Sequence, residues 1–298
     1  IVFIYFSHQM IKNNKVINMK KPLIAAIATV ALAAGAQAES KFYGKMNVSL
    51  HHSDVDPELS LNSNASRLGV DGDDSTKVIT QRDAYIGLAY SGMGTVKMGI
   101  MDTPLKKSQG KFDLFNDVVD IKNVITGENR IADSLNYTSE KMGPVQVSVS
   151  YIMKEDDTMD DGISASVVFK QGDLYASVAM DDKTKSENTA TQRATVIYSL
   201  GDIRLGALVN IVDDSDTADE DMAYAVNGSF KMGKNTIKVQ YEAGDQGKAQ
   251  APGATVVTAG VDHKLGKATK AFALVNMGDA DAPNSDSTTV AFGLEHKF

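Results

Sequence analysis

The sequence predicts an all-β fold, a transmembrane antiparallel β-barrel, from three observations. The chain ends in an alternating strand, Thr288–Phe298, whose last residue is aromatic. Segments of about ten residues with the same alternation recur along the chain, which is typical of strands that cross a membrane. The connections between these segments alternate between short glycine turns and long acidic loops, as they do at the two rims of a barrel.

The last strand separates its residues cleanly onto two faces. Phe292 and Leu294 point one way, and Gly293 and Glu295 point the other. A soluble domain seldom ends on an exposed aromatic in a strand, because chain termini fray in water. In an outer-membrane barrel the terminal aromatic, here Phe298, belongs to the girdle at the membrane interface. We therefore expect this strand to close the barrel.

The first part of the chain predicts export. Lysines at 20 and 21 precede an apolar run over residues 23–34 and the small residues Ala36 and Ala38. This is the layout of a secretory signal peptide, and the run is too short to span a bilayer. We expect residues 1–18 to be an upstream segment with no part in the fold, 19–38 to be a signal peptide and 39–298 to be a single barrel domain.

Composition excludes several classes of protein. The chain has no cysteine, so it offers no disulfide framework and no thiolate metal site. Its net charge of −8, with no clustered basic arm, argues against nucleic-acid binding. We find no serine-hydrolase elbow, P-loop or zinc-protease motif, and the acidic stretch 213–221 lacks the spacing of a calcium loop. We expect no cofactor, no metal and no enzymatic activity.

Turn spacing predicts the number of strands. Glycine turns at positions 92, 143, 172, 201, 233 and 266 recur at intervals that fit two strands, a loop and a turn. Counting the intervening segments predicts sixteen strands. If Thr76–Gln81 does not pair as the third strand, fourteen remain, and we keep that number as the alternative.

One interval is too long for that pattern. Between Gly92 and Gly143 about 20 residues are surplus, which predicts a long third loop over Thr103–Asn129. A loop with this many apolar residues should not lie free in water, so we expect it to fold into the lumen against the barrel wall and to form a short helix within Asp113–Val124. The apolar residues concerned are Phe112, Leu114, Phe115, Val118, Val119 and Ile121.

Five stretches, in order along the chain, resemble strand motifs of the general porins of Gram-negative bacteria. They are Phe42–Met46, Ser66–Val70, Arg82–Leu88 with Gly94–Gly99, Asp133–Ser139 and Phe292–Phe298. The resemblance implies a water-filled outer-membrane channel for passive diffusion of small hydrophilic solutes and ions. It also implies a homotrimer surrounded by lipid and lipopolysaccharide, and a last strand with Phe298 that the barrel-insertion machinery reads.

Charged residues on the lumen side are the candidates for the channel's narrowest point. Lys45 and Arg67 lie opposite apolar neighbours on their strands, and a lipid-facing Lys or Arg costs ~2–4 kcal/mol at mid-membrane. The family resemblance adds two more cations, so that a basic ladder faces the third loop. The ladder consists of Lys45, Arg67, Arg82 and Arg130, and the expected acidic partners are Asp113, Asp117 and Asp120.

Three alternatives to a general diffusion channel remain open from the sequence. The first is a substrate-selective outer-membrane channel, in which the third loop binds one class of solute. The second is an outer-membrane barrel enzyme, which would need a Ser/His/acid set that we cannot assemble. The third is a secreted soluble β-sandwich adhesin.

Overall fold

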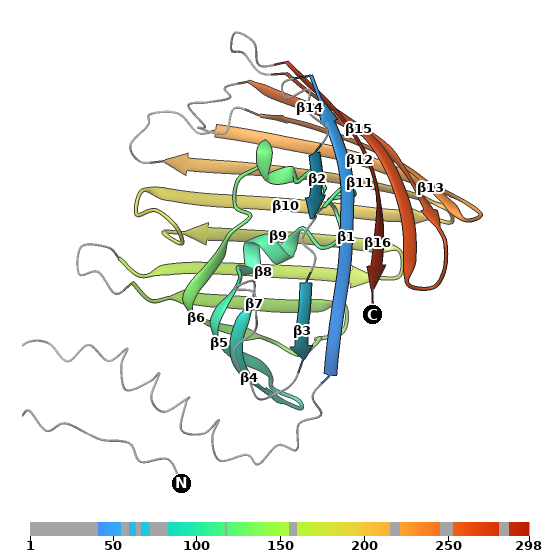
Figure 1. The fold of residues 1–298 in the computed structure, drawn as a ribbon. Coiled ribbons are helices and arrows are strands. Elements are labelled where there is room, and N and C mark those ends of the chain that lie inside the picture. The colour runs from blue at the N-terminus through green and yellow to red at the C-terminus, as the bar shows by residue number, and fades with distance from the viewer. Residues whose placement is uncertain are drawn as a thin grey trace, which may run out of the picture. The chain divides into compact units, whose positions relative to one another are not determined.

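The computed structural model describes residues 41–54, 60–63, 67–71, 83–116, 118–154, 160–214, 221–244, 253–279 and 286–297. These residues form almost entirely antiparallel β-strands (Figure 1). Within them, no helix has the length and apolar character required to cross a bilayer.

Sixteen strands and two short helical turns make up the described part of the chain. The strands are β1 (Lys41–Ser53), β2 (Ser60–Ser63), β3 (Arg67–Asp71), β4 (Ala84–Tyr90), β5 (Gly94–Asp102), β6 (Arg130–Thr138), β7 (Val145–Ile152), β8 (Gly162–Gln171), β9 (Leu174–Asp182), β10 (Thr189–Leu200), β11 (Ile203–Asp214), β12 (Asp221–Met232), β13 (Asn235–Gly244), β14 (Ala254–Lys264), β15 (Thr269–Asp279) and β16 (Ser287–Lys297). The helical turns are α2 (Pro104–Ser108) and the 3-10 turn η1 (Ile121–Asn123).

All strands belong to one sheet in which chain neighbours are also spatial neighbours from β4 to β16. The first and last strands then pair with each other, from Lys45 opposite Lys297 to Ser53 opposite Thr289. β2 and β3 pair with different halves of the same edge of β1, so the sheet is fifteen strands across. The segment Thr76–Gln81 lies outside the described residues, and the count of sixteen strands around the barrel therefore stays a prediction.

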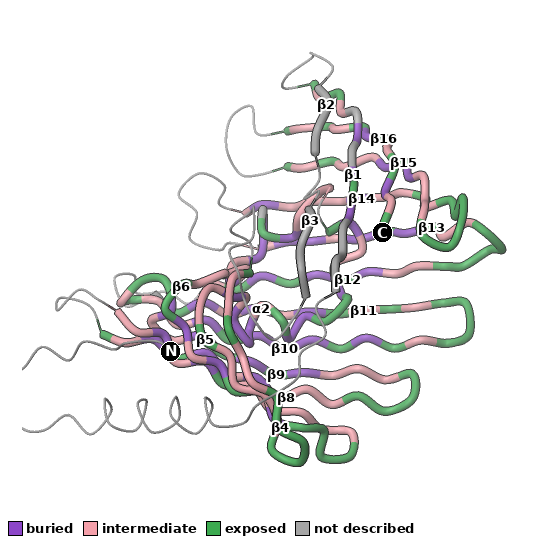
Figure 2. The backbone as a smooth tube through the Cα atoms, turned by 60° about the horizontal axis from the view of Figure 1, so that its bottom comes forward, coloured by how far each residue is buried: buried purple, intermediate pink, exposed green. Residues whose placement is uncertain are grey.

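The two faces of the sheet differ in the way that the alternation predicts. On β13, Lys238, Gln240 and Glu242 are buried, whereas Ile237 and Val239, at the alternating positions, are 46% and 47% exposed. Figure 2 shows buried positions along the middle of the strands and exposed ones at the short turns. Apolar side chains thus cover the outer surface of the strands, and we call the opposite surface the polar face.

The connections also follow the prediction. Short turns join β8 to β9 and β10 to β11, and Gly172 and Gly201 take positive φ angles of 56° and 60° there. Glycine adopts this conformation without a steric penalty, which a tight hairpin requires. The connections at the other ends of these strands are longer, and several of them extend beyond the described residues.

Phe298, the expected assembly signal, lies outside the described residues, and its role stays a prediction. We expect that its deletion reduces the amount of folded protein in the outer membrane severalfold, because β16, the last strand of the chain, pairs with the first strand, β1. Immunoblots of outer-membrane fractions measure this. Phe298→Tyr, which keeps an aromatic at the end, should behave as wild type, and normal levels after the deletion would refute the role.

Candidate channel site

The connection between β5 and β6, residues 103–129, lies against the polar face of the sheet, and we call it the long segment. It begins with α2, where the Thr103 hydroxyl accepts a hydrogen bond from the Lys106 amide and Pro104 takes the first helical position. The Leu105 amide donates to the Ser164 hydroxyl of β8 at 3.1 Å. These bonds attach the start of the segment to the wall.

The end of α2 is attached to β9. The carbonyl oxygen of Ser108 accepts hydrogen bonds from the Tyr175 hydroxyl at 2.7 Å and from the Ser177 hydroxyl at 2.6 Å. α2 lies earlier in the segment than the sequence predicts, and only η1 falls within the expected range of 113–124. The proline and the threonine cap explain the position of α2 better than the apolar spacing does.

Apolar residues of the long segment are buried in two clusters on the wall. In the first cluster, Phe112 and Ile121 are fully buried against Leu208 and Ala223. In the second, Phe115 packs against Leu274, with Leu114, Val118 and Val119 of the segment around it. All six apolar residues that were expected to fold against the barrel wall belong to these two clusters.

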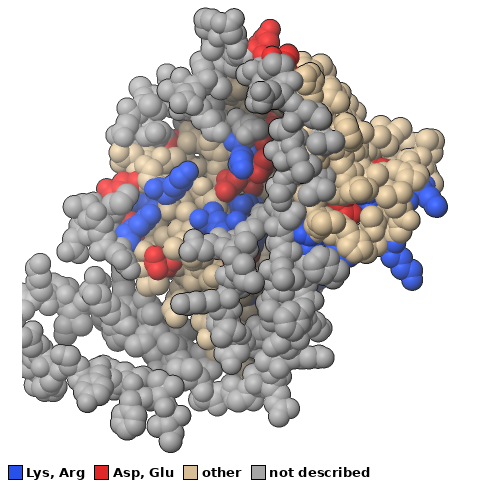
Figure 3. Space-filling model, in the orientation of Figure 1, with Lys and Arg blue, Asp and Glu red and all other residues tan. Residues whose placement is uncertain are grey.

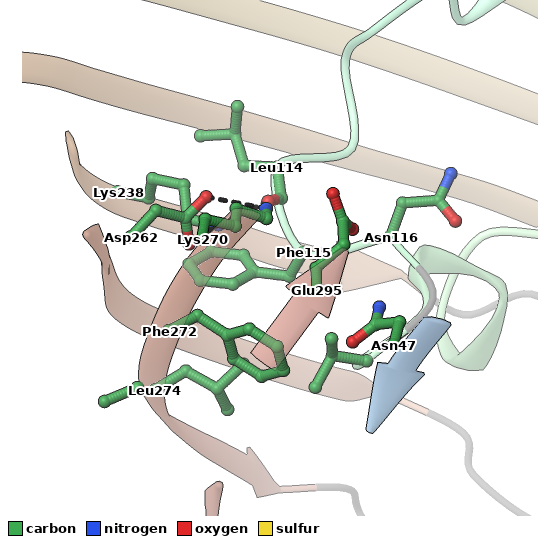
Figure 4. A pocket seen from close by; sticks show the side chains of 12 residues that line it. Asn47, Leu114, Phe115, Asn116, Lys238, Asp262, Lys270, Phe272, Leu274 and Glu295 are labelled. Atoms are coloured by element: carbon green, nitrogen blue, oxygen red, sulfur yellow. Dashed lines mark hydrogen bonds and ion pairs between the residues drawn. The ribbon is translucent and has the colours of Figure 1, made fainter. Parts of the chain in front are cut away.

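Glycines on the wall make room for both phenylalanines. A Cβ atom at Gly206 would lie 3.0 Å from the Phe112 ring, and one at Gly260 would lie 2.9 Å from the Phe115 ring. Both glycines are in strands with ordinary φ angles, so their role is close approach. Figure 4 shows Phe115 above Phe272, beside Lys238. The Lys238 ammonium lies 4.6 Å from the centre of the Phe115 ring.

Asp113 connects the segment to β13. One of its oxygens accepts from the Phe115 amide at 3.0 Å and from the Gln240 side-chain amide at 3.2 Å, and the other accepts from the Ile121 amide at 3.3 Å. The Leu114 amide donates back to the Gln240 oxygen at 3.0 Å. Burial raises the pKa of Asp113 to about 6 although these hydrogen bonds oppose the shift.

A buried ion pair fastens the end of the segment. Arg193 of β10 binds the Glu128 carboxylate at 2.6 Å and also donates to the Thr126 carbonyl and to Asn210. The side chain of Arg193 is completely buried. Burial raises the pKa of Glu128 and the Arg193 cation lowers it. Removing one partner of such a pair leaves an uncompensated buried charge, so each depends on the other.

The expected basic ladder is described only in part. Lys45 is buried and bridges Glu295 at 3.1 Å, and Arg130 binds Asp83 at 2.7 Å and Asp102 at 2.9 Å. The backbone of Arg67 pairs opposite Lys45, which places the two residues side by side. Arg82 lies outside the described residues.

The expected acids of the segment have separate positions. Asp113 is bound as described above, while Asp120 caps η1 and pairs with Lys122 at 3.3 Å. Asp117 lies outside the described residues. Arg193, Gln240 and Lys238 were missed by sequence reasoning, although each falls on the polar parity of its strand and could have been included on that ground.

A sheet with an apolar outer surface and a segment fastened across its polar face defines a membrane channel built from β-strands. Basic and acidic side chains gather together in the hollow of the face seen in Figure 3. Residues 55–283 match the family model described as Gram-negative porin, which covers more than half of the chain. The chain belongs to the Gram-negative porin family.

Solved structures agree on the fold. The anion-selective porin from Comamonas acidovorans is 18% identical with a TM-score of 0.74, covering 88% of this chain and 100% of that chain. In-vitro folded OmpT of Vibrio cholerae, in its trimer form, is 18% identical with a TM-score of 0.68, covering 88% and 100%. OmpF of Salmonella typhi in complex with daunomycin is 12% identical with a TM-score of 0.66, covering 87% and 97%.

A search of curated proteins found no match. Family and fold together establish an outer-membrane β-barrel that forms a channel for passive diffusion and is not an enzyme.

The close approach at Gly206 generates a test of the wall contact. Gly206→Val should destabilise the attached segment by about 1–3 kcal/mol, because a side chain there meets both Phe112 and Asn227. Limited proteolysis of the folded protein should then cut within residues 111–124. Gly228→Val is the matched control, since its nearest neighbour is the flexible tip of Leu205 at 3.4 Å. Equal protection in both variants would contradict the packing.

The raised pKa of Asp113 generates a test of pH dependence. A folded-state pKa of about 6, against 3.8 ordinarily, gives a contribution to stability that is full below pH 3.8 and lost as pH rises through 6. Asp113→Asn stays neutral throughout. Between pH 4 and 7 the free energy of unfolding of wild type should therefore fall relative to the variant by about 1–3 kcal/mol, measured by urea unfolding in micelles. Parallel pH profiles would show that Asp113 does not carry the effect.

Proposed function

We propose that the protein carries small hydrophilic solutes and ions through a water-filled channel whose narrowest point is set by the long segment. The observation that supports this most directly is the burial of Phe112, Phe115 and Ile121 against the polar face. A segment held in this way occupies space that an open barrel would leave to water.

Charges around the narrowing orient polar solutes in this proposal. Lys45, Arg67, Arg82 and Arg130 form the basic side, and Asp117 and Asp120 the acidic side, of a transverse field. We assign Asp113 to anchoring instead, because both of its oxygens already accept hydrogen bonds from the segment and from Gln240.

The assembled form in this proposal is a homotrimer in outer-membrane lipid and lipopolysaccharide, inserted by the barrel-insertion machinery. The trimer form of the structurally similar OmpT of Vibrio cholerae supports the trimer. The exposed apolar residues on the outer surface of the strands, such as Val226 and Val239, support contact with lipid or with a neighbouring subunit.

Replacing Lys111–Val124 with a short Gly-Ser linker tests the narrowing. We expect single-channel conductance in planar bilayers to rise at least about twofold and larger sugars to enter, because the wall lies open once the segment is gone. Heat-sensitive trimer migration on gels serves as the control for correct assembly. Unchanged conductance in an assembled variant would place the narrowest point elsewhere.

A further inference from the structure

A cavity of about 360 Å³ lies on the polar face beside the first half of the long segment. Three lysines line it: Lys107 from α2, Lys141 from the turn after β6, and Lys170 from the end of β8. Hydroxyl groups, such as those of Ser148 and Ser166, form another part of the lining, and Gln146, Val168 and Pro144 are among the remaining residues. We call this site the lysine cavity. Lys141 and Lys170 place it toward the rim of the short turns.

The residues that line the lysine cavity carry positive charge and no negative charge. No carboxylate is among its lining residues, and no ion pair joins Lys107, Lys141 or Lys170 to an acid within the described part of the chain. Elsewhere on the same face the arrangement is different. Lys238 and Lys270 both bind Asp262, at 2.9 and 2.8 Å. Three ammonium groups without an ion-pair partner in the described residues are therefore available to bind an added anion.

The walls of the cavity are held in place by contacts of their own. The Tyr175 hydroxyl, which lines the cavity, donates to the Ser108 carbonyl at 2.7 Å and so ties β9 to the end of α2. The Thr138 and Ser148 hydroxyls lie 3.0 Å apart across β6 and β7. A site with fixed walls needs little reorganisation to receive a ligand.

The surroundings of Lys107, the lysine from the long segment, lower its pKa. Burial lowers the pKa of Lys107, and the nearby cation of Lys97 acts in the same direction, while Asp83 and Asp102 act against it. A bound anion would raise this pKa again, because it favours the charged ammonium group.

We propose that the lysine cavity binds a soluble phosphate-bearing dianion of the size of a hexose phosphate. Several ammonium groups favour a multiply charged anion, and the volume lies within the range of small-molecule sites. The lining residues of the strands share the polar parity, opposite the apolar outer surface, so a dissolved solute is the ligand and a lipid headgroup is not. This inference rests on the proposed channel function. It adds the class of solute that binds and places the binding site toward the rim of the short turns.

A cavity beside the narrowing gives the binding a measurable consequence. A bound dianion next to the long segment should obstruct the ion current, and it should do so at lower concentration from the side of the short turns. Glucose 6-phosphate added to either chamber of a planar bilayer in 0.1 M KCl tests this, with glucose as the neutral probe and inorganic phosphate as the smaller anion.

Matched variants separate the cavity from the general field of the rim. Lys141→Gln with Lys170→Gln removes two charges from the cavity, and Lys231→Gln with Lys234→Gln removes two from the short turn between β12 and β13. All four lysines are exposed, so both double variants should fold. We expect the first pair to raise the half-blocking concentration of glucose 6-phosphate about tenfold and the second to leave it within about twofold of wild type.

The outcomes distinguish the cavity from the channel. Equal weakening in both double variants, or equal block by glucose, would overturn the lysine cavity and leave the channel intact. A channel that conducts ions but is not blocked by glucose 6-phosphate would also overturn the lysine cavity and leave the channel intact. A protein that forms no channel would refute the proposed function. The cavity is then decided by equilibrium dialysis of labelled glucose 6-phosphate against the protein in micelles, where binding lost in the first pair supports it and no binding overturns it.

Discussion

The hydrocarbon interior of a membrane offers no hydrogen-bonding partners, and the rest of this structure depends on that constraint. Each strand must pair along both edges, and within the described residues the continuous sheet does this for β1 and for β5 to β16. Lipid then requires apolar side chains on one surface, such as Ile237 and Val239. Polar groups are left with the opposite surface, so every feature that could act on a solute collects there.

The polar face in turn has to accommodate an apolar segment. It does so where its own residues are small, since Gly206 and Gly260 receive the rings of Phe112 and Phe115. Polar contacts then fix the position of the segment. Gln240 donates a hydrogen bond to Asp113, and Arg193 forms an ion pair with Glu128. The ring packing and the polar contacts hold different points of the same segment, and together they give the segment a single position on the wall.

Local pattern predicted the strands, the turns and the long segment, because each leaves a signal in adjacent residues. The partners of the segment could not be predicted in this way. Contact between Asp113 and Gln240 depends on how β13 is placed relative to a loop that leaves the sheet at β5, and no spacing within the sequence encodes this. The position of α2 was missed for a different reason, since capping by Thr103 and Pro104 outweighed apolar periodicity.

Net charge is a poor guide to the field inside such a channel. The chain carries a net charge of −8, but the distance over which each charge acts depends on whether an opposite charge lies beside it. Arg193 and Glu128 form a compact pair whose fields largely cancel within a few ångströms, whereas Asp262 offsets only one of the two positive charges of Lys238 and Lys270. Lys141 and Lys170, which form no ion pair with the residues that the structure describes, keep their full charge toward the solute. Because water and salt screen distant charges over about 10 Å, the nearest unpaired groups determine what a solute meets at each point along the wall.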